Sequence, residues 1–151
     1  MSRDEERYTF GSLMAVLIES ERKLKELYER AAEGISGAEV KSVVSEYGRN
    51  CSKRMEAMWK ARVETVVEMA LEPITSPKFA ELLGIINSTI QSVRVSNLEK
   101  LRTLERVVSE LYAEASPKIT QISAETGELL AALSRESAEH ARELERYLQH
   151  A

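Results

Sequence analysis

The chain has 151 residues, of which 43% are hydrophobic and 30% are charged, and 21 Lys and Arg against 25 Asp and Glu give it a formal net charge of −4. This mild acidity argues against nucleic-acid binding, because proteins that bind nucleic acid usually carry a basic domain or a clustered basic face. The chain is also too apolar for a disordered protein and too often interrupted by charge for a membrane span. We therefore expect one compact domain over residues 1–151, with no nucleic-acid or membrane partner.

The cysteine content and the first residues narrow the class further. Cys51 is the only cysteine, which excludes a disulfide within the chain and a metal site made of cysteines alone. The opening stretch, MSRDEERYTF, is charged and lacks the apolar core of a signal peptide. A cytoplasmic protein is therefore expected.

Apolar residues recur every three or four positions along most of the chain, which is typical of amphipathic helices. No stretch has the sustained alternation of a half-buried strand. In chain order, the predicted helices cover residues of about 9–33, 37–71, 77–92, 97–115 and 117–149.

Helix-capping residues mark the four breaks between these helices. Each break offers a side chain that can satisfy free N–H groups at a helix start, and two breaks also place proline at the first helical position, where its missing N–H costs little. The predicted caps are Ser36 with Glu39, Ser76 with Pro77, Ser96 with Glu99, and Ser116 with Pro117, and Gly34 suits the end of the first helix.

The lengths of the connections predict the topology. Short turns join the 9–33 helix to the 37–71 helix and the 97–115 helix to the 117–149 helix, so each pair is expected to form an antiparallel hairpin. The 77–92 helix then lies on the long crossover between the hairpins. We predict an all-α fold, an antiparallel four-helix bundle with a partly helical crossover. If four helices already close the core, the apolar face of the crossover helix is left over, and we expect it to pack against a second copy in a homodimer.

An internal repeat links the two hairpins. Residues 12–31 align without a gap on residues 96–115, at an offset of 84, with 8 of the 20 positions identical. The shared block is Glu-Arg, three variable residues, and Glu-Leu-Tyr, which begins at Glu21 in the first copy and at Glu105 in the second. Duplication of a helical hairpin explains this match, and convergence of two amphipathic helices is the alternative.

The repeat places a carboxylate on the apolar face of each helix. Seven residues are close to two helical turns, so Glu21 and Tyr28 project from one face, as do Glu105 and Tyr112. Burying an ionised carboxylate costs several kcal/mol unless another group compensates for it. The sequence therefore predicts a site at Glu21 and Glu105 in the core of the bundle.

At these residues the chain resembles the ferritin-like superfamily, the relatives of rubrerythrin and ferritin, whose first and third bundle helices carry Glu-x6-Tyr. The resemblance implies a di-iron centre in the bundle core, with one glutamate from each of two helices and a Glu-x-x-His motif from each of the other two. It also implies that His140 occupies a histidine position. The remaining three positions of the two motifs hold Ser137, Gly48 and Cys51.

These departures predict that the di-iron site is incomplete. Ser137 and Gly48 cannot supply the missing carboxylates, and two ferrous ions would be poorly neutralised by the two that remain. Glu136 and Glu139 project away from the face of Ser137 and are expected on the solvated face.

Two interpretations of the site stay open. In one, Glu21, Glu105, His140 and Cys51 bind a single iron or zinc ion, with Tyr28 and Tyr112 supporting the ligands. In the other, the site is free of metal. The two glutamates then accept hydrogen bonds from the tyrosines of the opposite repeat and share one proton, Cys51 and His140 are ordinary core residues, and Arg102 is a further candidate to neutralise a carboxylate.

The expected function depends on which of these two interpretations of the site is correct. We expect a ferritin-like bundle with an incomplete di-iron site, no catalytic residues and a non-enzymatic binding or structural role. The first alternative is a metalloprotein with a reduced or mononuclear iron or zinc centre that handles iron or peroxide. The second is an unrelated helical adaptor, which need not place Glu21 opposite Glu105.

Overall fold

The computed structural model describes residues 7–65 and 72–150, and these residues form five α-helices and one pair of very short strands. The helices are α1 (Phe10–Gly34), α2 (Ala38–Glu64), α3 (Pro77–Gln91), α4 (Asn97–Thr120) and α5 (Ala124–Gln149). The strands are β1 (Arg7–Tyr8) and β2 (Ile74–Thr75). The predicted all-α class is confirmed for the described residues. None of the helices in this part of the chain is both long enough and apolar enough to cross a lipid bilayer.

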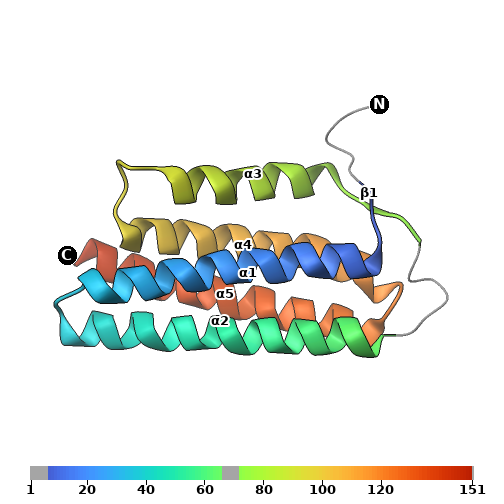
Figure 1. The fold of residues 1–151 in the computed structure, drawn as a ribbon, viewed down its shortest axis with the longest axis horizontal. Coiled ribbons are helices and arrows are strands. Elements are labelled where there is room, and N and C mark those ends of the chain that lie inside the picture. Colours follow the sequence, from blue (N-terminus) through green and yellow to red (C-terminus); the bar gives the residue numbers. More distant parts are fainter. Residues whose placement is uncertain (1–6, 66–71, 151) are drawn as a thin grey trace.

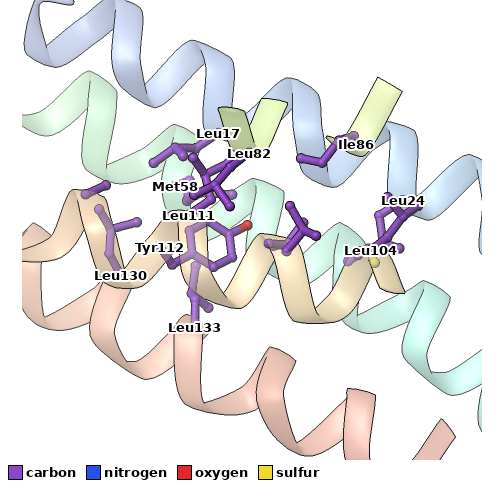
Figure 2. Packing of buried hydrophobic residues seen from close by; sticks show 14 of the residues in the cluster. Leu17, Leu24, Met58, Leu82, Ile86, Leu104, Leu111, Tyr112, Leu130 and Leu133 are labelled. Atoms are coloured by element: carbon purple, nitrogen blue, oxygen red, sulfur yellow. The ribbon is translucent and has the colours of Figure 1, made fainter. Parts of the chain in front are cut away.

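The helices pack as two hairpins with a fifth helix beside them. α1 packs on α2 and α4 packs on α5, as the short connections predicted, and α1 also contacts α4. α3 lies along α4 and α1, on the side away from α2 and α5 (Figure 1). All five helices contribute to one hydrophobic cluster, in which Leu17, Met58, Leu82, Leu111 and Leu130 each represent a different helix (Figure 2).

The crossover helix buries its apolar face within its own chain. Phe79, Leu82 and Ile86 are at most 5% exposed and belong to the common cluster. This face was the reason to expect a homodimer, so its burial removes that argument. Homodimerisation itself stays a prediction.

Side-chain caps define most helix starts. Ser76 Oγ accepts a hydrogen bond from the Lys78 amide with Pro77 at the first helical position, and Ser96 Oγ accepts one from the Glu99 amide. Both starts agree with the sequence analysis.

The start of α2 differs from the prediction. Gly37 is its N-cap and has no side chain to accept a hydrogen bond, so the expected capping box of Ser36 and Glu39 is wrong. The end of α2 is also earlier than expected, because the described helix stops at Glu64, and the predicted continuation over 66–71 falls outside the described residues.

The predicted break at Ser116-Pro117 is also wrong, because α4 continues through Pro117 to Thr120. Proline lacks the N–H that would bond to the carbonyl four residues earlier, so this turn has one helical hydrogen bond fewer. Burial of Ile119 at 0% exposure favours the extra turn. The next helix starts instead at Ser123, whose Oγ accepts from the Thr126 amide.

The strand pair was not expected from the sequence. Arg7 pairs with Thr75 and Tyr8 with Ile74 in an antiparallel arrangement. Two residues are too few to show an alternating pattern, so this pairing leaves no sequence signal. It ties the segment before α1 to the segment before α3.

Gly127 provides a test of the α4–α5 turn. A Cβ at this position would lie 1.9 Å from Thr120 Oγ1 and 2.9 Å from Thr120 Cα. We expect Gly127→Ala to lower the free energy of unfolding by about 2 kcal/mol, despite the higher helix propensity of alanine. Gly84→Ala is the control, since a Cβ there meets nothing within 4 Å, and it should raise that free energy by about 0.5–1 kcal/mol. Urea unfolding measures both, and equal effects would contradict the close approach at Gly127.

Candidate functional site: a buried arginine between two carboxylates

Glu21 of α1 and Glu105 of α4 lie in the core, each 0% exposed. Tyr112 Oη donates a hydrogen bond of 2.6 Å to Glu21 Oε1, and Tyr28 Oη donates one of 2.6 Å to Glu105 Oε2. Each carboxylate thus accepts from the tyrosine of the opposite repeat, as the sequence analysis expected for a metal-free core. The two repeats meet face to face in the interior.

The positive charge between the two carboxylates comes from Arg54 of α2, which is 1% exposed. Its Nη1 lies 3.1 Å from Glu21 Oε1 and 3.2 Å from Glu105 Oε1, so one nitrogen serves both acids. Its Nη2 lies 2.7 Å from His140 Nδ1, and its Nε donates to Glu136 Oε1 at 3.0 Å. A single side chain therefore connects all four bundle helices.

Sequence reasoning missed Arg54, although a signal was present. Arg54 lies three residues after Cys51 and four before Met58, both of which are 0% exposed. It therefore stands on the inward stripe of α2, as Glu21 does on α1. The resemblance implies ligands on α2 at the positions of Gly48 and Cys51, and it gives no reason to expect a cation on the same stripe.

Two expectations about neighbouring charges were wrong. Arg102 does not neutralise the buried acids, because its Nη1 donates to Glu145 on α5. Glu136 is not simply solvated: its side chain is 42% exposed, but its Oε1 pairs with the Nε of Arg54 at the edge of the core. In both cases the packing of neighbouring helices selected the partner.

His140 of α5 lies against one anion and one cation, the carboxylate of Glu105 and the guanidinium of Arg54. Its Nδ1 lies 2.9 Å from Glu105 Oε2 as well as 2.7 Å from Arg54 Nη2. A guanidinium only donates and a carboxylate only accepts, so one Nδ1 can hydrogen-bond to only one of them at a time. The imidazole ring is held in place by Tyr47, on which it stacks with 3.7 Å between ring centroids and 9° between planes.

The other three residues in the motif positions are small and buried. A Cβ at Gly48 would lie 3.3 Å from Tyr28 Cβ, so this glycine permits a close approach of α2 to α1. Cys51 is 0% exposed, and burial, reinforced by the nearby charge of Glu21, raises the pKa of its thiol and keeps it protonated. Ser137 Oγ and Glu21 Oε2 are both buried, and neither has a hydrogen-bond partner among the described residues.

The site shifts the pKa values of the two carboxylates in opposite directions. Burial raises the pKa of Glu21, and the neighbouring charge of Glu105 adds to this, although Arg54 opposes it. Burial acts on Glu105 in the same direction, but the hydrogen bond to His140 and the charge of Arg54 outweigh it and lower its pKa. The geometry agrees, because both Glu105 oxygens accept hydrogen bonds, whereas Glu21 Oε2 has none.

Arg54 keeps its charge in this site. Burial lowers the pKa of the guanidinium, but the charges of Glu105 and Glu21 outweigh that effect and raise it. Burial next to an acidic partner also raises the pKa of Tyr28 and of Tyr112, so both hydroxyls stay protonated and donate. Arg54 is therefore the cation of the core, and Glu105 is the acid whose ionised form the site favours.

The residues predicted to bind a metal ion are Glu21, Glu105, His140 and Cys51. The structure brings the first three of them to the guanidinium of Arg54 and places Cys51 one helical turn before Arg54. In the described part of the chain, no group of three or more His, Cys, Asp or Glu side chains has an arrangement suited to a metal ion. Metal binding by these four residues stays a prediction.

Comparisons with models of protein families, with curated protein sequences and with solved structures give no match to this chain.

The unequal carboxylates predict unequal effects of neutral substitutions. Glu105→Gln removes the counter-charge of a buried arginine and should lower the free energy of unfolding by about 3–5 kcal/mol at pH 7. Glu21→Gln keeps an oxygen for Tyr112 and Arg54 and resembles the protonated acid, so a loss of about 1 kcal/mol or less is expected. Urea unfolding of the two variants checks this, and similar losses would show that the acids share the charge equally.

The dependence of stability on pH should differ in the same way. Because the pKa of Glu105 is lowered on folding, its contribution to stability is present above the pKa of an unfolded glutamate, about 4.3, and is lost as pH falls through the lowered value. Because the pKa of Glu21 is raised, its contribution is present at low pH and is lost as pH rises through the raised value. Relative to the wild type, Glu21→Gln should therefore gain stability as pH rises. If the difference in the free energy of unfolding between Glu21→Gln and the wild type does not change with pH, the raised pKa of Glu21 is contradicted.

Proposed function

We propose that this protein is a ferritin-like bundle in which the guanidinium of Arg54 takes the place of the metal charge, and that it has a non-enzymatic binding or structural role. The observation that carries the proposal is the position of Arg54 Nη1, 3.1 Å from Glu21 Oε1 and 3.2 Å from Glu105 Oε1.

The topology supports the ferritin-like part of this proposal. Two antiparallel hairpins are joined by a long connection that carries α3. Glu21 and Glu105 face each other, and His140 contacts Glu105, as the resemblance implies. An unrelated helical adaptor has no physical reason to place these residues together, so the arrangement favours the ferritin-like alternative.

The charges of the site support the absence of a metal ion. A divalent ion placed among Glu21, Glu105 and His140 would stand within a few ångströms of a fixed guanidinium, and two like charges repel strongly in a site that excludes water. The site already has a cation for its ionised carboxylate. Cys51 would also have to lose its proton against a raised pKa.

The contacts of Arg54 support a structural role. Its guanidinium donates to Glu21 on α1, Glu105 on α4 and Glu136 on α5, and it lies against His140 on α5. Buried ionic groups of this kind add little net stability, but they penalise alternative packings that leave a charge unpaired. We propose that Arg54 fixes the relative positions of the four helices and so gives the surface of the bundle one defined shape.

Metal uptake by two variants tests the proposal. Wild-type protein purified without a chelator and incubated with Co²⁺ should hold well under one metal ion per chain and show no thiolate–Co²⁺ absorption band. Arg54→Ala removes the guanidinium and leaves Glu21, Glu105, His140 and Cys51 around the freed space. This variant should bind Co²⁺, and Glu105→Gln in the same background should abolish the binding.

The control is Arg62→Ala, which removes an arginine from the same helix whose guanidinium lies 5.5 Å from the Trp59 ring centroid, and this variant should bind no Co²⁺. Circular dichroism of each variant shows whether it is folded. Stoichiometric iron or zinc in the wild type, lost on Glu105→Ala, would overturn the proposal and establish the metalloprotein alternative.

A further inference from the structure

The seam between α2 and α5 contains a groove that reaches the outer edge of Arg54. The groove has a volume of about 310 Å³ and is lined by Asn50, Lys53, Arg54, Ala57, Leu133 and Glu136. Its volume is at the lower end of the range for small-molecule sites. The polar lining consists of two cations, one amide and one carboxylate.

The carboxylate of Glu136 shows where an acidic group binds in this groove. Its Oε1 lies 3.0 Å from Arg54 Nε and 4.0 Å from His140 Nε2, so it stands at the outer edge of both buried side chains. Glu136 itself is 42% exposed, whereas Arg54 is 1% exposed. The arginine thus has a fixed place, and its acidic partner comes from the surface.

We infer that this groove is a binding site for a small oxyanion, a phosphate or a carboxylate, which replaces the side chain of Glu136 on Arg54 Nε. The inference rests on the proposed function, because it requires an arginine, and no metal ion, between Glu21 and Glu105.

Replacing the Glu136 carboxylate by an external oxyanion changes the hydrogen bonding of Arg54 little. Leaving a buried guanidinium N–H without a partner would be costly, but an incoming oxyanion restores the same charge-assisted hydrogen bond that Glu136 gives up. The released Glu136 is on the surface, where water can solvate it, and partly exposed ion pairs contribute little to stability. Small changes at the groove can therefore decide which anion is bound.

Lys53 and Asn50 supply the additional attraction for the ligand. Lys53 is exposed and Asn50 is partly buried, and neither side chain has an ion pair or hydrogen bond to another residue in the part of the chain described. An ammonium and an amide beside Arg54 give an oxyanion donors from three side chains. Glu136 already accepts from Arg54, whereas an external anion can also accept from Lys53 and Asn50.

Titration with inorganic phosphate, followed by the NMR signal of Arg54 Nε–H, tests the inference on the full chain. Glu136→Gln removes the competing carboxylate and should tighten phosphate binding about tenfold over the wild type. Lys53→Ala in that background should reverse most of the gain. Glu110→Gln, which removes the same charge from the exposed face of α4, is the control and should bind phosphate as the wild type does.

A parallel titration with acetate identifies the class of anion. Competition by acetate at similar concentrations indicates a site for carboxylates, and binding of phosphate alone indicates a site for phosphoryl groups; both outcomes support an oxyanion site. Binding of neither anion by Glu136→Gln, or equal binding by Glu136→Gln and Glu110→Gln, overturns the inference. Metal analysis of the same samples separates the two proposals, because metal-free protein without anion binding contradicts only the oxyanion site.

Discussion

The arrangement of the bundle depends on one buried ion network, in which Arg54 lies between Glu21 and Glu105. Each member would be costly to bury alone, and each is compensated only when α1, α2 and α4 are in their native positions. Hydrophobic packing brings amphipathic helices together but tolerates small shifts along the helix axes. An ion network with distances near 3 Å does not, so it selects one relative position of the helices.

The network also explains why two repeated halves behave differently. The Glu and Tyr residues are related by the internal repeat, and their hydrogen bonds are reciprocal and equal at 2.6 Å. The symmetry is broken by the partner helices: α5 gives Glu105 an imidazole, whereas α2 contributes the buried thiol of Cys51 on the side of Glu21. The hydrogen bond to His140 and the charge of Arg54 lower the pKa of Glu105, whereas burial raises that of Glu21, so the site favours the ionised form of Glu105.

The side chain of Arg54 also connects the core to the surface. Nη1 of Arg54 donates to the two acids and Nη2 lies against His140, while Nε donates to Glu136 at the α2–α5 seam. A ligand that replaces Glu136 would therefore contact the residue that links the four helices. This geometry gives the bundle a physical route by which binding at the surface can affect its core.

The sequence by itself determined the helical class, the positions of most helices and the burial of Glu21, Glu105, Tyr28 and Tyr112, because periodicity shows which face each residue occupies. Periodicity does not show which side chain on a neighbouring helix lies at the same height. Only the tertiary structure decided that Arg54 neutralises the acids while Arg102 pairs with Glu145, and that α4 continues through Pro117 to bury Ile119. These outcomes depend on contacts between segments far apart in the chain, where long flexible side chains have several partners within reach and packing selects among them.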